Sequence, residues 1–121
     1  MRFMAMIKSD ERTDAGATPT AEDLEAMGRF NEELVKAGVL LAGEGLLDSS
    51  KGARVRQSGG TATVIDGPFA EAKELVAGFW LLEVKSREEA VEWVKRIPCT
   101  TDEPSFVEIR QVFEAEEFVT G

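Results

Sequence analysis

Residues 64–84 place a polar turn directly before the longest apolar segment of the chain. The turn is the Asp-Gly-Pro-Phe sequence at 66–69, and a nearly continuous apolar run follows at 75–84. Asp and Gly favour a tight turn, and Pro68 fixes its own φ and lacks a backbone N–H donor. Because charged residues surround a turn that leads into a buried strand, this segment predicts ionisable groups at the rim of a core.

The remaining elements are recognised by their caps and turns. Thr20 with Asp23, and Ser86 with Glu89, have the spacing of capping boxes at the starts of two helices. Glycines at 59 and 60 allow the positive φ of a tight hairpin between strands at 54–57 and 61–65. Further strands are expected at 2–7, 39–46, 75–84 and 106–112.

The resulting order, β-α-β-β-β-α-β, predicts a ferredoxin-like α+β fold. Its antiparallel sheet would carry two helices on one face and an extra β-hairpin. At 121 residues, the length suits a single domain over residues 1–121.

The apolar pattern also predicts assembly. Segments 3–7, 39–42 and 78–82 are apolar at both odd and even positions, although one face of an antiparallel sheet normally meets water. Two helices cover only one face, so a second copy is the simplest cover for the other. Burial of several large side chains, at roughly 1.5 to 3 kcal/mol each, is enough to hold a symmetric homodimer together.

Charge and composition exclude several functions. The net charge of −9 argues against a nucleic-acid partner, which needs clustered Lys and Arg. No apolar run approaches the roughly 20 residues that cross a membrane, and residues 1–8 are interrupted by charge and favour a strand over a signal peptide. The single cysteine, Cys99, excludes an internal disulfide and suits a reducing cytoplasm.

Several blocks, in this order, resemble the DGPF branch of the YCII-related family. They lie at 3–7, 30–34, 37–41, 43–46, 66–71, 73–74, 89–93 and 107–110. The resemblance implies a ferredoxin-like fold, a dimer of the α/β-barrel type and a polar cleft near the motif at 66–69. It implies no agreed reaction: some relatives resemble enzymes with a His-Asp pair, and this chain has no histidine. A regulatory role linked to extracytoplasmic-function sigma factors is a further implication.

Five residues are candidates for a site, and each has a structural alternative. Glu44, between two glycines, is either a partly buried proton-handling group or a solvent-facing strand end. Asp66 is either an acceptor or general base, or a turn residue that binds backbone amides. Lys73 suits an anionic ligand or a surface ion pair, and Arg56 suits a carboxylate clamp or an exposed strand face. Trp80 favours the core or an interface over a ligand platform.

Neither a metal nor a cofactor is expected. Without histidine and with one cysteine, only an all-carboxylate site remains, and no calcium-binding or nucleotide-binding motif occurs. Two classes of function therefore stay open: a cofactor-free enzyme or binder of a small polar or anionic molecule, and a regulatory or protein-interaction module. The first predicts that Glu44, Asp66 and Lys73 converge at one edge of the sheet, beside Trp80 or Phe69.

Overall fold

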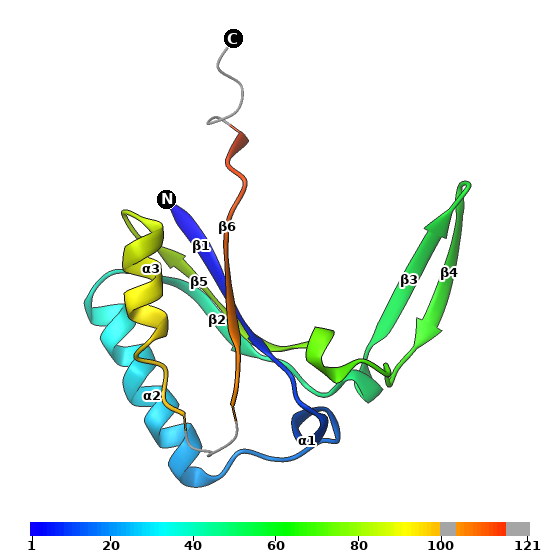
Figure 1. Cartoon of the computed structure of the whole chain (residues 1–121), viewed down its shortest axis with the longest axis horizontal. Helices are drawn as coiled ribbons and strands as arrows, with labels where there is room; N and C mark the ends of the chain where they lie inside the picture. Colours follow the sequence, from blue (N-terminus) through cyan, green and yellow to red (C-terminus); the bar gives the residue numbers. More distant parts are fainter. Residues whose placement is uncertain (100–103, 116–121) are drawn as a thin grey trace.

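The computed structural model describes residues 1–99 and 104–115, apart from the side chains of Arg12 and Lys73. These residues form a four-stranded antiparallel sheet in the order β2-β5-β1-β6. The strands are β1 (Arg2–Lys8), β2 (Leu40–Gly45), β5 (Val76–Glu83) and β6 (Val107–Gln111). The long helices, α2 (Ala21–Lys36) and α3 (Arg87–Val94), both lie on one side of this sheet (Figure 1). The predicted α+β class is confirmed, and the strand order is that of a ferredoxin-like sheet.

The predicted hairpin forms a second, two-stranded sheet. It consists of β3 (Ala53–Ser58) and β4 (Thr61–Asp66), which we call the arm. Gly59 and Gly60 turn the chain between β3 and β4 with φ of 59° and 81°. The hairpin turn predicted from these two glycines is therefore confirmed. The arm projects from one end of the main sheet, on the side away from α2 and α3 (Figure 1).

Three short elements were not predicted from the sequence. They are the one-turn helix α1 (Glu11–Asp14) and the 3₁₀ turns η1 (Ser49–Lys51) and η2 (Ala72–Glu74). In α1, the Asp10 carboxylate accepts a 2.6 Å hydrogen bond from the Thr13 amide. A single turn has no apolar period, so no local pattern in the sequence predicts α1.

The predicted helix starts are confirmed, with one difference. Thr20 and Asp23 form the reciprocal capping box, with bonds of 3.1 Å and 3.0 Å. Ser86 accepts from the Glu89 amide at 3.1 Å, but the Glu89 carboxylate accepts from the Lys85 amide at 3.2 Å. No helix in residues 1–99 and 104–115 combines the length and apolar character of a membrane span.

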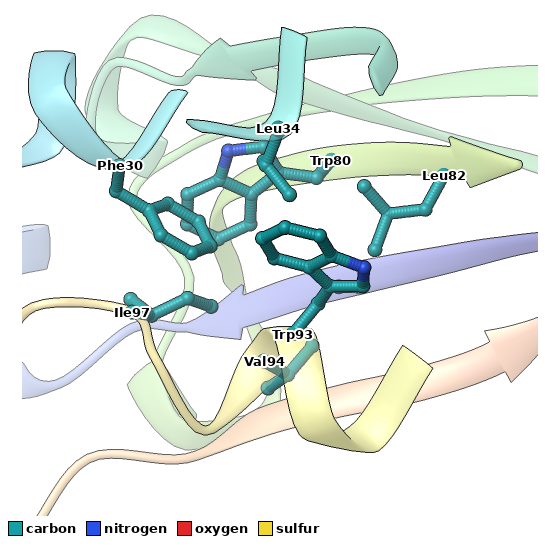
Figure 2. A pocket seen from close by; sticks show the side chains of 8 residues that line it. Phe30, Leu34, Trp80, Leu82, Trp93, Val94 and Ile97 are labelled. Carbon is teal, nitrogen blue, oxygen red and sulfur yellow. The ribbon is translucent and has the colours of Figure 1, made fainter. Parts of the chain in front are cut away.

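The core lies between the sheet and the two long helices. Alternate residues of β1 and β5 point into it because side chains alternate across a strand. Trp80 of β5 is 5% exposed, meets Phe30 of α2 edge to face at 5.7 Å, and donates its indole N–H to Asn31 at 2.8 Å. Figure 2 shows these rings around a hollow between α2, α3 and the sheet, which leaves no room for a water molecule. This arrangement agrees with the structural alternative for Trp80.

The intervening residues of the same strands form what we call the open sheet face. Residues that pair directly across antiparallel strands share a face. The pairing therefore gives two cross-strand rows, which are Glu44-Phe79-Met6-Glu108 and Ala42-Leu81-Met4-Arg110. The four central side chains are half-buried and apolar, while three of the four edge positions are charged and the fourth is Ala42. The two-sided apolar strands that the sequence indicated are therefore confirmed, and within residues 1–99 and 104–115 no long helix covers their second face (Figure 1).

The chain after β6 is held to β1 by an ion pair and by a hydrogen bond of 2.8 Å from the Val112 amide to the Arg2 carbonyl. Arg2 donates two hydrogen bonds, of 2.6 Å and 3.0 Å, to the carboxylate of Glu114. These hydrogen bonds, and then the charge of Arg2, hold the pKa of Glu114 below its ordinary value. A lowered pKa means that the pair contributes stability above the ordinary carboxyl pKa and loses it as the pH falls through the lowered value.

We expect Arg2→Gln to raise the pKa of Glu114 towards its ordinary value, because the replacement donates weaker, uncharged hydrogen bonds. A carbon NMR titration of the Glu114 carboxyl group measures this directly. Arg29→Gln, which removes the distant exposed pair with Glu25, is the control and should leave the Glu114 titration unchanged. An unchanged titration in Arg2→Gln would contradict the assignment of the cause.

Candidate functional site

The Asp-Gly-Pro-Phe motif forms the root of the arm. The Gly67 amide donates to the Gly52 carbonyl at 3.0 Å, which closes the base of the hairpin. The Ser49 carbonyl approaches Gly67 so closely that a Cβ at this position would lie 1.7 Å from its oxygen. Only glycine fits this contact, so the motif's glycine is required by packing.

Two polar residues fix the other side of this root. Asp14 accepts from the Ser49 amide at 2.7 Å and from the Ser49 hydroxyl at 2.6 Å. The Ser49 hydroxyl in turn accepts from the Phe69 amide at 3.1 Å, and the Arg54 guanidinium lies over the Phe69 ring, 4.0 Å from its centroid. We call these contacts, together with those of Gly67, the motif joint. They link α1, η1, the motif and the arm.

A cavity of about 360 Å³ opens beside the end of β1. This volume lies within the range of roughly 300 to 1,000 Å³ that is usual for small-molecule sites. The described residues that line it are Lys8, Ser9, Asp10, Pro104, Ser105 and Phe106. They supply one ammonium, one carboxylate, two hydroxyl groups and an apolar wall.

The cavity is tied to the segment that follows the motif. Lys8 donates from its side chain to the Glu74 carbonyl of η2 at 3.3 Å, and the Ser9 amide donates to the Leu75 carbonyl at 2.9 Å. The Lys8 amide also donates to the Phe106 carbonyl at 2.9 Å, which joins the two walls. An ammonium has three N–H donors, so this contact with η2 leaves donors for an anionic or carbonyl group of a ligand.

The candidates from the sequence lie in several places. Glu44 is exposed on the open sheet face, and Asp66 is exposed at the end of β4, in the other sheet. Arg56 and Asp66 project from opposite faces of the arm, since Asp66 pairs with Ala53, three positions before Arg56, and side chains alternate along a strand. Lys73 belongs to η2, and its side chain lies outside the described part of the chain.

The glycine before Glu44 has a structural reason. A Cβ on Gly43 would lie 2.9 Å from Cδ1 of Trp80, so glycine makes room for the buried indole. On the neighbouring strand, a Cβ on Gly78 would meet the Glu44 carbonyl at 3.1 Å. The sequence indicated that small residues permit a close approach here, and within this chain the approaching groups are Trp80 and backbone.

Sequence reasoning missed the residues that define the joint and the cavity. Asp14 and Ser49 lie 35 positions apart, and the cavity combines residues 8–10 with 104–106. No local pattern marks any of them, because only the sheet topology brings these segments together. Among the described residues, no group of three or more acidic or Cys side chains is placed to hold a metal ion.

With the fold and these sites in place, comparison with known proteins gives the class. Residues 1–116 match the YCII-related domain, and the chain therefore belongs to the YCII-related family. It is also similar to an uncharacterised protein of Rhizobium meliloti (strain 1021), with 34% identity over 88 residues. That match covers 73% of this chain and 68% of the relative.

The motif joint predicts a sharp contrast between two identical substitutions. Gly67→Ala should destabilise the fold by about 2 kcal/mol or more, because its methyl group overlaps the Ser49 carbonyl. Gly28→Ala, in α2 where the new methyl group meets nothing within 4 Å, should stabilise by about 0.5 to 1 kcal/mol. Urea unfolding of both variants measures the difference, and equal stabilities would refute the role assigned to Gly67.

Proposed function

We propose that this protein is a homodimer that binds a small polar or anionic molecule, without a bound cofactor, in the cavity beside the end of β1. The observation that carries the proposal is the cavity of about 360 Å³ with Lys8, Ser9 and Ser105 in its lining. An ammonium and two hydroxyls are suited to a carboxylate, a phosphate or a carbonyl oxygen, and the apolar wall to a short carbon skeleton. The Asp-Gly-Pro-Phe sequence supports placement in the DGPF branch of the family.

Within this proposal the acidic candidates have separate roles. Asp10 lines the cavity but uses one carboxylate oxygen to cap α1, so we assign it an orienting role. Glu44 and Asp66 are absent from the described lining. They stay candidates for proton transfer only if the ligand binds on the open sheet face or at the arm.

The homodimer is the second part of the proposal. The apolar centre of the open sheet face supports it, because half-buried Met, Phe and Leu side chains gain free energy when a second copy excludes the remaining water. A two-fold axis lets the same face serve both copies, which gives the dimer of the α/β-barrel type.

An interaction module is the alternative function. It is favoured by the exposure of every strand residue of the arm, and a regulatory role linked to extracytoplasmic-function sigma factors is its most specific form. Ligand binding that depends on the cavity residues separates the two functions.

We expect small carboxylates or phosphate monoesters to raise the melting temperature of the purified protein. A ligand at 100 times its Kd stabilises by about 2.7 kcal/mol. Lys8→Met keeps the aliphatic stem and removes the ammonium, so it should abolish the shift, whereas Lys85→Met, an exposed lysine just ahead of α3, should preserve it.

Glu44→Ala provides the comparison between sites. If it abolishes the shift while Lys8→Met does not, the ligand binds at the open sheet face and the cavity assignment is wrong. If no compound in a broad metabolite panel shifts the wild-type melting temperature, the binding function itself fails and the interaction module gains support.

Sedimentation at micromolar concentration should give about twice the 13.2 kDa mass of the chain. Leu81→Asp, at the centre of the open sheet face, should shift the mass towards the monomer because an unpaired carboxylate would be buried in the interface. Leu24→Asp, on exposed α2, is the matched control. A wild-type protein that sediments as a monomer would refute the proposed homodimer.

A further inference from the structure

The arm has the properties of an element that is stabilised by something outside its own chain. All six residues of β3 and all six of β4 are exposed. Two-stranded hairpins are marginally stable in water when nothing packs against them. The arm nevertheless extends as a regular ladder from Ala53 and Asp66 to Ser58 and Thr61.

The two faces of the arm differ. Val55 pairs with Val64, and Gln57 with Ala62, so these side chains share one largely apolar face. The two valines are 57% and 64% exposed. Asp66, paired with Ala53, ends this face at the base of the arm, and the other face carries Arg54 and Arg56 together with Ile65, which is 45% exposed.

The base of the arm is fixed by the motif joint, whereas its two strands are exposed. The motif joint binds the base of the hairpin to η1 and α1 through the contacts of Ser49 and Gly67 described above. The direction of the arm is therefore set by the body of the protein. Figure 1 shows that this direction leads away from the sheet on the side opposite α2 and α3, which is the side of the open sheet face.

We infer that the arm packs on a second copy of this chain, so that in the homodimer the arm of each copy contacts the other copy. This inference rests on the homodimer proposed above and adds a second contact region to it. The apolar face of the arm, centred on Val55 and Val64, supplies the contact.

The size of the interface supports a second copy as the occupant. A stable interface takes about 20 residues from each partner. The open sheet face offers two rows of four residues, and half of these positions are charged or alanine. The arm lies on the same side (Figure 1), and one of its faces adds six positions, so the two surfaces together come closer to that size than either does alone.

Charge complementarity points to the same occupant. The arm, residues 53–66, contains Arg54, Arg56 and Asp66, which gives it a net charge of +1. The whole chain carries −9, so the remainder carries −10, from −9 minus 1. The positively charged arm is therefore attracted to the acidic body of another copy, and its two arginines, on the face opposite Val55 and Val64, act at a distance and not in the apolar contact.

Hydrogen–deuterium exchange of the wild-type protein tests the inference without any substitution. The ladder amides of β3 and β4 should exchange about 100-fold more slowly at a concentration where the protein is dimeric than after dilution to monomer, because an unsupported hairpin opens readily. Amides of β1 and β5, at the centre of the main sheet, serve as the reference and should change less. Arm amides that exchange equally fast in both states would overturn the inference.

A matched pair of variants supplies the second measurement. Val64→Glu, at 64% exposure, should raise the dimer dissociation constant at least about tenfold, because it removes an apolar contact and adds a negative charge facing an acidic partner. Val35→Glu makes the same change on α2 at 62% exposure and should leave the constant unchanged. Sedimentation measures both, and circular dichroism confirms that each variant is folded.

The outcomes separate the two proposals. A wild-type dimer with equal constants for Val64→Glu and Val35→Glu overturns the arm contact and leaves the homodimer standing. A wild-type protein that stays monomeric up to its solubility limit overturns the homodimer and the arm contact together, and leaves the arm to a partner of another kind. Ligand binding in the cavity is measured separately and survives either result.

Discussion

Side-chain alternation along β1 and β5, the two central strands, is the constraint on which the rest of the structure depends. Both strands are apolar at successive positions, so each sends large side chains to both faces of the sheet. Two helices are enough for one face, where Trp80 and Phe30 close the core. The same alternation leaves Met and Phe side chains on the other face, and this unequal coverage is the reason for the homodimer that we propose.

The main features of the fold were predictable because they are encoded locally. A capping residue and its partner three positions later mark a helix start, and paired glycines mark a hairpin, so Thr20 and Gly59 sufficed to place their elements. The cavity was not predictable, because it depends on the pairing of β1 with β6, which are about 100 residues apart. The motif joint was not predictable for the same reason, since Asp14 and Ser49 come into contact only in the folded chain.

The Asp-Gly-Pro-Phe motif acquires a different meaning in the structure from the one its charged residue indicated. The contacts described for it involve the glycine's lack of a side chain, the Phe69 amide and the Phe69 ring. Each of these holds the arm at a fixed direction. Asp66 itself is exposed at the end of β4. A motif that positions an element has as strong a physical reason for its residues as one that carries out chemistry.

The absence of histidine limits the side chains that are available for proton transfer in the cavity. A general acid or base works best with a pKa near the working pH, and histidine is the side chain that meets this condition without strong perturbation. This chain contains no histidine. In the cavity, the carboxylate of Asp10 is partly used as a helix cap, and the Lys8 ammonium is held by a backbone carbonyl of η2. The contact with η2 fixes the position of the Lys8 ammonium, and its remaining N–H groups are donors of the kind that recognition of a carboxylate or phosphate requires. The cavity therefore has the properties of a recognition site, which is the role that we propose for it.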